Sequence, residues 1–139
     1  KDKAVLTLMK LDKVIETDLK TISVNATLGD LVKKVSRSSR NIFPVIDEDE
    51  GLLGIVLLDD IRKIMFNQDL YDTTFVRDFM TTPPTVVDVT DPMDVVMKKF
   101  EDTQAWNLPV IENEKYVGFV SKAKIFNTYR RVLQHFSDE

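Results

Sequence analysis

The sequence contains no cysteine, only four glycines and a single histidine. Without cysteine the chain cannot form disulfides or use a thiolate as nucleophile or ligand, which is compatible with a reducing compartment. His135 alone cannot build a histidine-rich metal site. The few glycines form no Walker loop, no dinucleotide fingerprint and no Gly-x-Ser-x-Gly elbow. We therefore expect a protein that is not an enzyme, with no catalytic residues and no bound metal.

Long apolar runs and blocks of one charge sign are also missing. No stretch approaches the ~20 apolar residues that a membrane helix needs, and the basic start of the chain lacks the cleavage site of a signal peptide. The chain has 19 basic and 23 acidic residues, a net charge of −4, so nucleic acid is not an expected partner. The basic residues that do cluster indicate solvated helix faces: Lys98 and Lys99, and Lys122, Lys124, Arg130 and Arg131.

The sequence does contain an internal repeat. The run Phe43-Pro44-Val45-Ile46-Asp47 returns as Leu108-Pro109-Val110-Ile111-Glu112, with a shift of 65 from Pro44 to Pro109. After one slip inside a turn the shift is 64, from Gly54 to Gly118. A register held this long is strong evidence for two copies of one structural unit.

Each copy predicts a strand, an amphipathic helix, a hairpin and a second helix, from its hydrophobic periodicity and β-branched runs. Thr27 and Asp91 carry helix-start signals. The expected ranges in the first copy are strand 21–24, helix 28–36, hairpin strands 42–46 and 53–58, and helix 59–66. Those in the second are strand 85–89, helix 92–101, hairpin strands 108–111 and 116–120, and helix 122–133.

The fold class is therefore α/β (α+β), with two βαββα repeats that we expect to pack as a pseudo-twofold pair. A three-stranded sheet with two helices leaves one face uncovered, which a second copy can cover, and a cleft where two sheets meet is a common kind of ligand site. We assign residues 1–11 to a linker or helix from an upstream segment, 12–66 to repeat 1, 67–76 to a linker, and 77–139 to repeat 2 with a C-terminal helix.

The Pro-Val-Ile-Asp strand, the hairpin and a following Gly-h-h-[Ser/Thr]-x-x-Asp pattern resemble the CBS domain, which occurs in tandem as a Bateman module. The resemblance covers residues 12–66 and 77–130. The flanking segments resemble the C-terminal cytoplasmic CBS pair of bacterial CLC-type voltage-gated chloride channels and transporters. That resemblance implies a homodimer, an upstream transmembrane channel domain, a location at the cytoplasmic face of the inner membrane, and modulation of ion transport.

In nucleotide-binding members of that family the Asp of the motif binds ribose hydroxyls and the Ser/Thr faces phosphate. The first copy keeps Asp60 but has Leu57 at the hydroxyl position; the second keeps Ser121 but has Lys124 where the Asp belongs. The resemblance implies Asp60 as a ribose ligand, Ser121 and Lys124 as phosphate ligands, and ATP, ADP or AMP as the only candidate cofactor. Helix capping is the alternative role of Asp60 and Ser121. The second site could equally be dead, which would leave a dimerisation scaffold.

Other conspicuous residues predict core, turn or interface. The acidic run 47–50 indicates a solvated hairpin turn and not a cation site, and Trp106 and Tyr71 indicate packing or an interface. A stripe at helical spacing predicts core, extended by a dimer contact: Ile125, Phe126, Tyr129, Val132, Leu133 and Phe136. The alternative functions are a stand-alone CBS pair and a regulatory domain of an enzyme or cation transporter.

Overall fold

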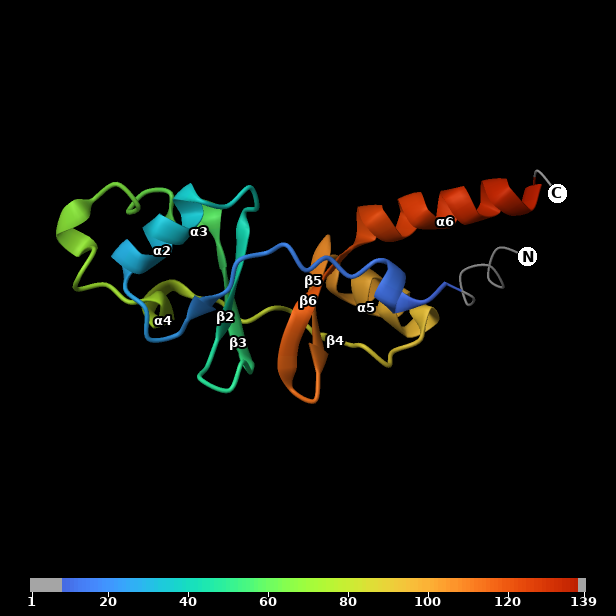
Figure 1. Ribbon diagram of the computed structural model, residues 1–139, viewed down its shortest axis with the longest axis horizontal. Helices are drawn as coiled ribbons and strands as arrows, with labels where there is room; N and C mark the ends of the chain where they lie inside the picture. The colour runs from blue at the N-terminus through green and yellow to red at the C-terminus, as the bar shows by residue number, and fades with distance from the viewer. Residues whose placement is uncertain (1–8, 138–139) are drawn as a thin grey trace. The chain divides into compact units, whose positions relative to one another are not determined.

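The computed structural model describes the backbone of residues 9–137 and the side chains of residues 9–135 (Figure 1). It contains two three-stranded sheets, in the orders β1-β2-β3 and β4-β5-β6. The strands are β1 (Ile22–Ser23), β2 (Ile42–Ile46), β3 (Leu52–Leu57), β4 (Val87–Asp88), β5 (Asn107–Glu112) and β6 (Lys115–Ser121). The helices are α2 (Leu28–Ser36), α3 (Leu58–Ile61), α4 (Val76–Phe79), α5 (Met93–Thr103) and α6 (Lys122–Ser137), with short 3-10 helices η1 (Leu11–Lys13) and η2 (Gln68–Leu70). The predicted α/β class is confirmed.

The repeat seen in the sequence holds at the level of single strand pairings. Strand β1 pairs in parallel with β2, with Ile22 opposite Val45, and β4 pairs in parallel with β5, with Val87 opposite Val110. Both pairings are related by the shift of 65. The hydrogen bond that follows β1, from Val24 N to the carbonyl of Ile46, is 3.0 Å long. Its counterpart in the second sheet has the same length.

The first helices of the two copies begin differently. Thr27 caps α2 in a capping box: its hydroxyl accepts the N–H of Asp30, whose carboxylate accepts the N–H of Thr27. Asp91 does not cap α5, contrary to its predicted role. Its carboxylate instead accepts the N–H of Asp88 at 3.0 Å and the Lys99 ammonium at 2.8 Å. The carboxylate therefore ties the end of β4 to α5.

The second helices differ from the prediction in one copy. A helix was expected over residues 59–66, but α3 has only four residues, and beyond it the Ile61 carbonyl accepts the N–H groups of both Ile64 and Met65. A run of turns follows in place of an i→i−4 ladder. Helix α6 extends over 16 residues. The linker or helix assigned to residues 1–11 lies mostly outside the described residues, and the one-turn helix α4 was missed.

The chain groups into two compact units that are not continuous in sequence. The first, here called the α6 unit, joins Lys1–Thr17 to Pro84–Glu112 and Val117–Glu139. The second, the α2 unit, joins Asp18–Pro83 to Asn113–Tyr116. The segment that precedes each repeat is thus grouped with the other repeat, whereas the ranges 12–66 and 77–139 inferred from the sequence are continuous.

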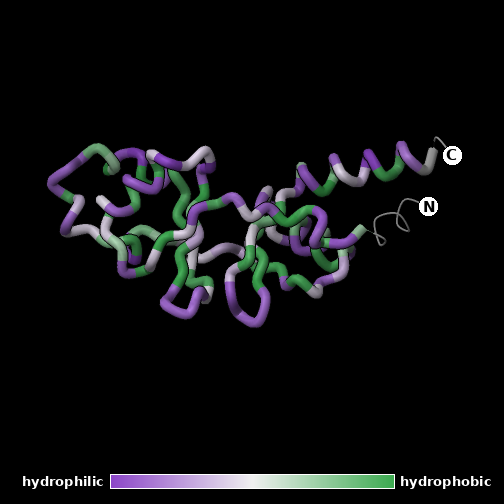
Figure 2. Tube along the Cα trace, in the orientation of Figure 1, coloured by the Kyte–Doolittle hydropathy of each residue, from purple (hydrophilic) through white to green (hydrophobic). Residues whose placement is uncertain are grey.

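Each unit has its own hydrophobic core. In Figure 2 the hydrophobic residues follow the strands of each sheet, and the hairpin turns are hydrophilic. Burying one large apolar side chain contributes about 1.5–3 kcal/mol. Among the described residues, no helix is both long and apolar enough to cross a bilayer. Fully buried side chains of the α6 unit include Phe100, Leu108, Val110, Val120 and Ile125; those of the α2 unit include Leu31, Phe43, Val45, Val56 and Ile61.

A short extended strap lies against the last strand of each sheet. In the α6 unit, Glu16 and Phe119 exchange two backbone hydrogen bonds of 2.7 and 2.9 Å. In the α2 unit, Thr81 and Ile55 exchange two bonds of 2.8 Å. The residue before each strand partner is a glycine. A Cβ on Gly118 would lie 2.6 Å from the Glu16 oxygen, so the glycine is required for the close approach of the strap.

Candidate functional site

Ser121 ends β6 and precedes α6. Its Oγ accepts the backbone N–H of Lys124 at 2.9 Å, as a helix cap does. A serine hydroxyl has one donor hydrogen in addition to its acceptor lone pairs. The hydrogen can still be donated to a ligand oxygen while the cap is in place. The capping role and the phosphate-binding role of Ser121 are therefore compatible.

The first turn of α6 carries an unusual charge. It contains Lys122 and Lys124 and no acidic residue, whereas the first turns of α2, α3, α4 and α5 are all acidic. Cations near a helix N-terminus meet the positive end of the helix dipole, which costs roughly 0.3–1 kcal/mol each. The Lys124 ammonium forms no ion pair among the described residues. An anionic group bound here would relieve this repulsion.

Trp106 is fixed beside this helix start. The backbone N–H of Lys122 donates to the Trp106 carbonyl at 2.9 Å, and the Lys122 ammonium lies 5.4 Å from the centre of the indole. The Trp106 side chain is 70% exposed, so of the two predicted alternatives, packing or an interface, packing in the core does not apply. The prediction of an interface role for this residue remains.

The apolar stripe predicted on α6 is core at Ile125 and at Tyr129, which packs against the core of the α6 unit. The prediction is wrong at Phe126, which is 40% exposed. The Phe136 side chain lies outside the described residues.

The junction between β3 and α3 in the α2 unit has the same kind of backbone hydrogen bond. Here the Leu58 N–H donates to the Asn41 carbonyl at 2.9 Å. Asp60 lies in the single turn of α3 and is exposed. Its neighbour Asp59 is paired with Arg62 at 2.7 Å. The Asp60 carboxylate makes no hydrogen bond or ion pair within the described part of the chain. It neither caps α3 nor holds a neighbour, and so it is open to a ligand.

The three residues inferred from the sequence thus lie in different units, each at the start of the second helix of its copy. Ser121 and Lys124 meet in the α6 unit, where the cap joins them. Asp60 belongs to the α2 unit. A carboxylate accepts hydroxyl donors, and a serine with a lysine suits phosphate oxygens. The two copies therefore present opposite chemistry at equivalent positions.

Two other expectations can be compared with the structure. The Tyr71 hydroxyl donates to the Met65 carbonyl at 2.5 Å, and the Tyr71 carbonyl accepts the Gly29 N–H, so Tyr71 packs within its unit. In the acidic run, the Asp47 carboxylate accepts the N–H groups of Asp49 and Gly51, each at 2.8 Å. This is a hairpin turn. No group of three acidic or histidine side chains that could hold a metal occurs among the described residues.

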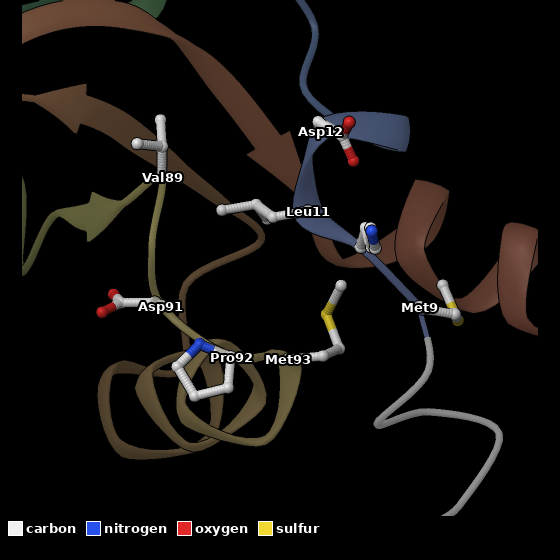
Figure 3. Close-up of a pocket in the computed structure, with 8 residues that line it drawn as sticks. Met9, Leu11, Asp12, Val89, Asp91, Pro92 and Met93 are labelled. Atoms are coloured by element: carbon white, nitrogen blue, oxygen red, sulfur yellow. The ribbon is translucent and has the colours of Figure 1, made fainter.

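Sequence reasoning missed a cavity of about 350 Å³ in the α6 unit (Figure 3). The side chains of Leu11 and Met93 point toward its middle, and Asp91, whose charge is balanced by Lys99, lies at its edge. Its walls come from η1 and from the start of α5, which are far apart in the chain. The spacing of residues within one copy could not have revealed it.

Comparison with known proteins identifies the family to which the chain belongs. The family model of the CBS domain matches residues 11–67 and 76–131. The chain belongs to the CBS domain family and contains two copies of the domain, as the internal repeat predicted. The narrower resemblance to chloride-channel CBS pairs is not shown by these matches.

Two curated relatives match most of this chain. Homoserine O-acetyltransferase of Methanobrevibacter ruminantium is 27% identical over 104 residues, which are 75% of this chain and 20% of that protein. The uncharacterized protein YlbB of Bacillus subtilis is 28% identical over 115 residues, which are 81% of this chain and 76% of that protein. The chain spans about a fifth of the acetyltransferase, so the match does not extend to that whole protein.

Solved structures share the fold of the tandem pair. CbpB, in a complex with c-di-AMP, has a TM-score of 0.78 and 17% identity, and the match covers 99% of this chain and 95% of CbpB. The cytosolic domain of the Mg²⁺ channel MgtE, in a complex with ATP, has a TM-score of 0.70 and 18% identity. That match covers 86% of this chain and 48% of the MgtE chain. At such identities the likeness shows the fold alone.

Proposed function

We propose that this chain is a regulatory CBS pair that binds an adenine nucleotide and has no catalytic activity. The observation that carries the proposal is the exposed Asp60 carboxylate, which has no partner in the described part of the chain although Asp59 beside it is paired. The structural neighbours bound to c-di-AMP and to ATP support an adenine nucleotide as the ligand class.

The proposed roles follow from the chemistry of the candidate residues, taken separately in each copy. Asp60 accepts hydrogen bonds from both ribose hydroxyls, since a carboxylate has two acceptor oxygens. Ser121 donates its hydroxyl hydrogen to a phosphate oxygen, and Lys124 supplies the positive charge. No bond of the nucleotide is made or broken. The outcome of binding is a shift between two arrangements of the module, limited by the difference in affinity for the two.

For the parent protein we propose a CLC-type chloride channel or transporter, with this module as a homodimer at the cytoplasmic face of the inner membrane. The support is the resemblance of the flanking segments and the neighbour that is the cytosolic domain of a channel. The second candidate is a stand-alone CBS pair, which is favoured by the match to 76% of YlbB. The gene that encodes the chain distinguishes the two, because a multi-span segment upstream is expected only for the channel.

The test is thermal unfolding of the chain with ATP, ADP or AMP. A ligand at a hundred times its Kd stabilises the native state by about 2.7 kcal/mol, so the melting temperature should rise. We expect Asp60→Ala to abolish the rise and Asp59→Ala, the control at the neighbouring exposed carboxylate, to keep it. No rise with any of the three nucleotides at millimolar concentration would contradict the sensing function. The dimerisation scaffold would then be the remaining role.

A further inference from the structure

A pair of lysines on the first helix of each copy has different surroundings in the two units. The shift of 65 relates residues 33–34 of α2 to Lys98 and Lys99 of α5. In the second copy both lysines have acidic partners: Lys98 pairs with Asp102 and Lys99 with Asp91, each at 2.8 Å. Lys99 is half-buried, so the prediction of a solvated helix face is wrong at this residue.

The Asp91 carboxylate occupies a small anion site in the second copy. One of its oxygens accepts both the Lys99 ammonium at 2.8 Å and the backbone N–H of Asp88 at 3.0 Å. Lys99 is itself held in place, since it also donates to the Val86 carbonyl at 2.8 Å. Hydrogen bonds between charged groups are the stronger ones in proteins. The end of β4 and the middle of α5 thus form a built site for a carboxylate.

The first copy keeps the lysines and lacks both acidic partners. Ala26 stands where the second copy has Asp91, and Arg37 stands where it has Asp102. The turn that carries Ala26 is the same, because the Ala26 N–H donates to the Ser23 carbonyl at 3.0 Å and the counterpart of this bond is 2.9 Å long. The Ala26 side chain therefore starts from the same turn as that of Asp91 and ends at its first carbon.

A pocket of about 380 Å³ lies at this place in the α2 unit. Its lining includes Ala26 and Ser23, and three cationic side chains line it from α2: Lys33, Lys34 and Arg37. None of these three side chains forms an ion pair or a hydrogen bond among the described residues. The volume is in the range of small-molecule sites.

The charge of the pocket selects the kind of ligand. Its lining has three cations and one carboxylate, that of Asp30, which already accepts the Thr27 N–H at 3.0 Å. Basic residues in the last turn of a helix are common, because they interact with the negative end of the helix dipole. Here they also converge on a pocket at which the other copy places a carboxylate. The excess of two positive charges matches a dianion.

We propose that this pocket binds a small dianion through the oxygens of a carboxylate or phosphate group. Lys34 takes the role that Lys99 has in the second copy, and the Ser23 N–H takes that of the Asp88 N–H, since both strand pairings have the same register. The Arg37 guanidinium offers the planar set of donors that suits either group. The inference goes beyond nucleotide binding and uses none of the residues proposed for it.

The test is a titration of the isotope-labelled chain with inorganic phosphate or with succinate at about pH 8, followed by its backbone amide signals. We expect saturable shifts at residues 22–26 and along α2, and none with sodium chloride at the same ionic strength. Saturation by phosphate alone assigns a phosphate group as the ligand, and saturation by succinate alone assigns a dicarboxylate. Shifts at these residues that do not saturate, or that sodium chloride reproduces, would overturn the proposal.

The first variant is Lys34→Gln with Arg37→Gln, which removes two of the three cations. We expect its affinity for the saturating anion to fall about ten-fold or more, since hydrogen bonds to charged groups are lost. The matched control is Lys20→Gln with Lys63→Gln, two exposed lysines of the same unit outside the pocket lining, which should bind as the parent chain does. An equal fall in both double variants would overturn the proposal.

The second variant is Ala26→Asp, which restores the carboxylate that the second copy has at this position. We expect it to pair with Lys34 and to abolish the response to the anion, whereas Ala26→Ser, of similar size but uncharged, keeps it. An Ala26→Asp chain that binds the anion as the parent does would overturn the proposal. So would a shift from dimer to monomer in Lys34→Gln with Arg37→Gln, because the pocket would then hold an acidic group of a second copy.

Asp60→Ala separates this proposal from the nucleotide function. We expect this variant to bind phosphate or succinate at the α2 pocket unchanged, because Asp60 is not among the residues that line it. Lys34→Gln with Arg37→Gln should in turn keep the rise in melting temperature with nucleotide. Failure of either function therefore leaves the test of the other standing.

Discussion

At the scale of single residues, Tyr116 is the group whose titration the structure changes most. Burial raises the pKa of Tyr116 from 10.0 to about 12; the smaller influences are the Arg40 guanidinium, which lowers the pKa, and the Asp18 carboxylate, which raises it. In the unfolded chain the phenol ionises near its ordinary pKa, while in the native protein it stays neutral to higher pH. The stability that this raised pKa contributes is therefore present below pH 10 and is lost as the pH rises toward 12.

The measurement is the melting temperature from pH 9 upward, for the parent chain and for Tyr116→Phe. We expect the parent chain to lose stability more steeply than the variant between pH 10 and pH 12. Parallel curves for the parent and Tyr116→Phe would contradict the assignment.

At the scale of elements, the sequence predicted the strands, α2, α5 and α6 because hydrophobic periodicity and β-branched runs are local signals. It failed where other parts of the molecule decide the outcome. The length of α3 is one such case, since the sequence 59–66 has helical spacing and yet makes one helical turn followed by irregular turns. Asp91 is another: its sequence position suits a cap, but its carboxylate pairs with Lys99, eight residues further along on α5.

The strap of the α6 unit, in which Glu16 pairs with Phe119, is the element-scale feature that a single substitution tests most directly. In Gly118→Ala the new Cβ would lie 2.6 Å from both the Glu16 oxygen and the Ile15 Cγ2. We expect the variant to lose about 1–3 kcal/mol of stability, the usual cost of overpacking, measured by urea unfolding. Gly29→Ala on α2 is the control, since the nearest atom there is Tyr71 Cβ at 3.1 Å and alanine favours the helix by about 1 kcal/mol. Equal stability of Gly118→Ala and the parent chain would show that the strap does not need the glycine.

At the scale of the whole molecule, the sequence indicated the tandem pair but not that the segment before the first repeat joins the unit of the second repeat. A shift of 65 relates two copies and says nothing about which copy the preceding segment contacts. The pairing of Glu16 with Phe119 depends on contacts between residues more than a hundred positions apart. The candidate site residues were inferred from the motif of the resembled family, and their role in binding stays a prediction. The exposure of Asp60 and Trp106 became visible only in the structure.

Assembly is the first whole-molecule prediction. Phe66 of the α2 unit is 80% exposed, the highest value among the large hydrophobic side chains described, and we expect it to be covered in the homodimer that the family resemblance implies. We expect sedimentation velocity to show a homodimer and Phe66→Ser to shift it toward monomer. Lys63→Ser, at an exposed polar position nearby in the chain, should leave the dimer intact. A strict monomer at high concentration would contradict the assembly.

The most direct test of the central claim is a titration of the isotope-labelled chain with ATP, followed by the NMR signals of its backbone amides. We expect saturable shifts that include Leu58–Ile61, the helix that carries Asp60, and the start of α6 at Ser121 and Lys124. The Asp60→Ala chain should lose the shifts at α3. A spectrum that does not change up to millimolar ATP, ADP or AMP would contradict nucleotide sensing by this CBS pair.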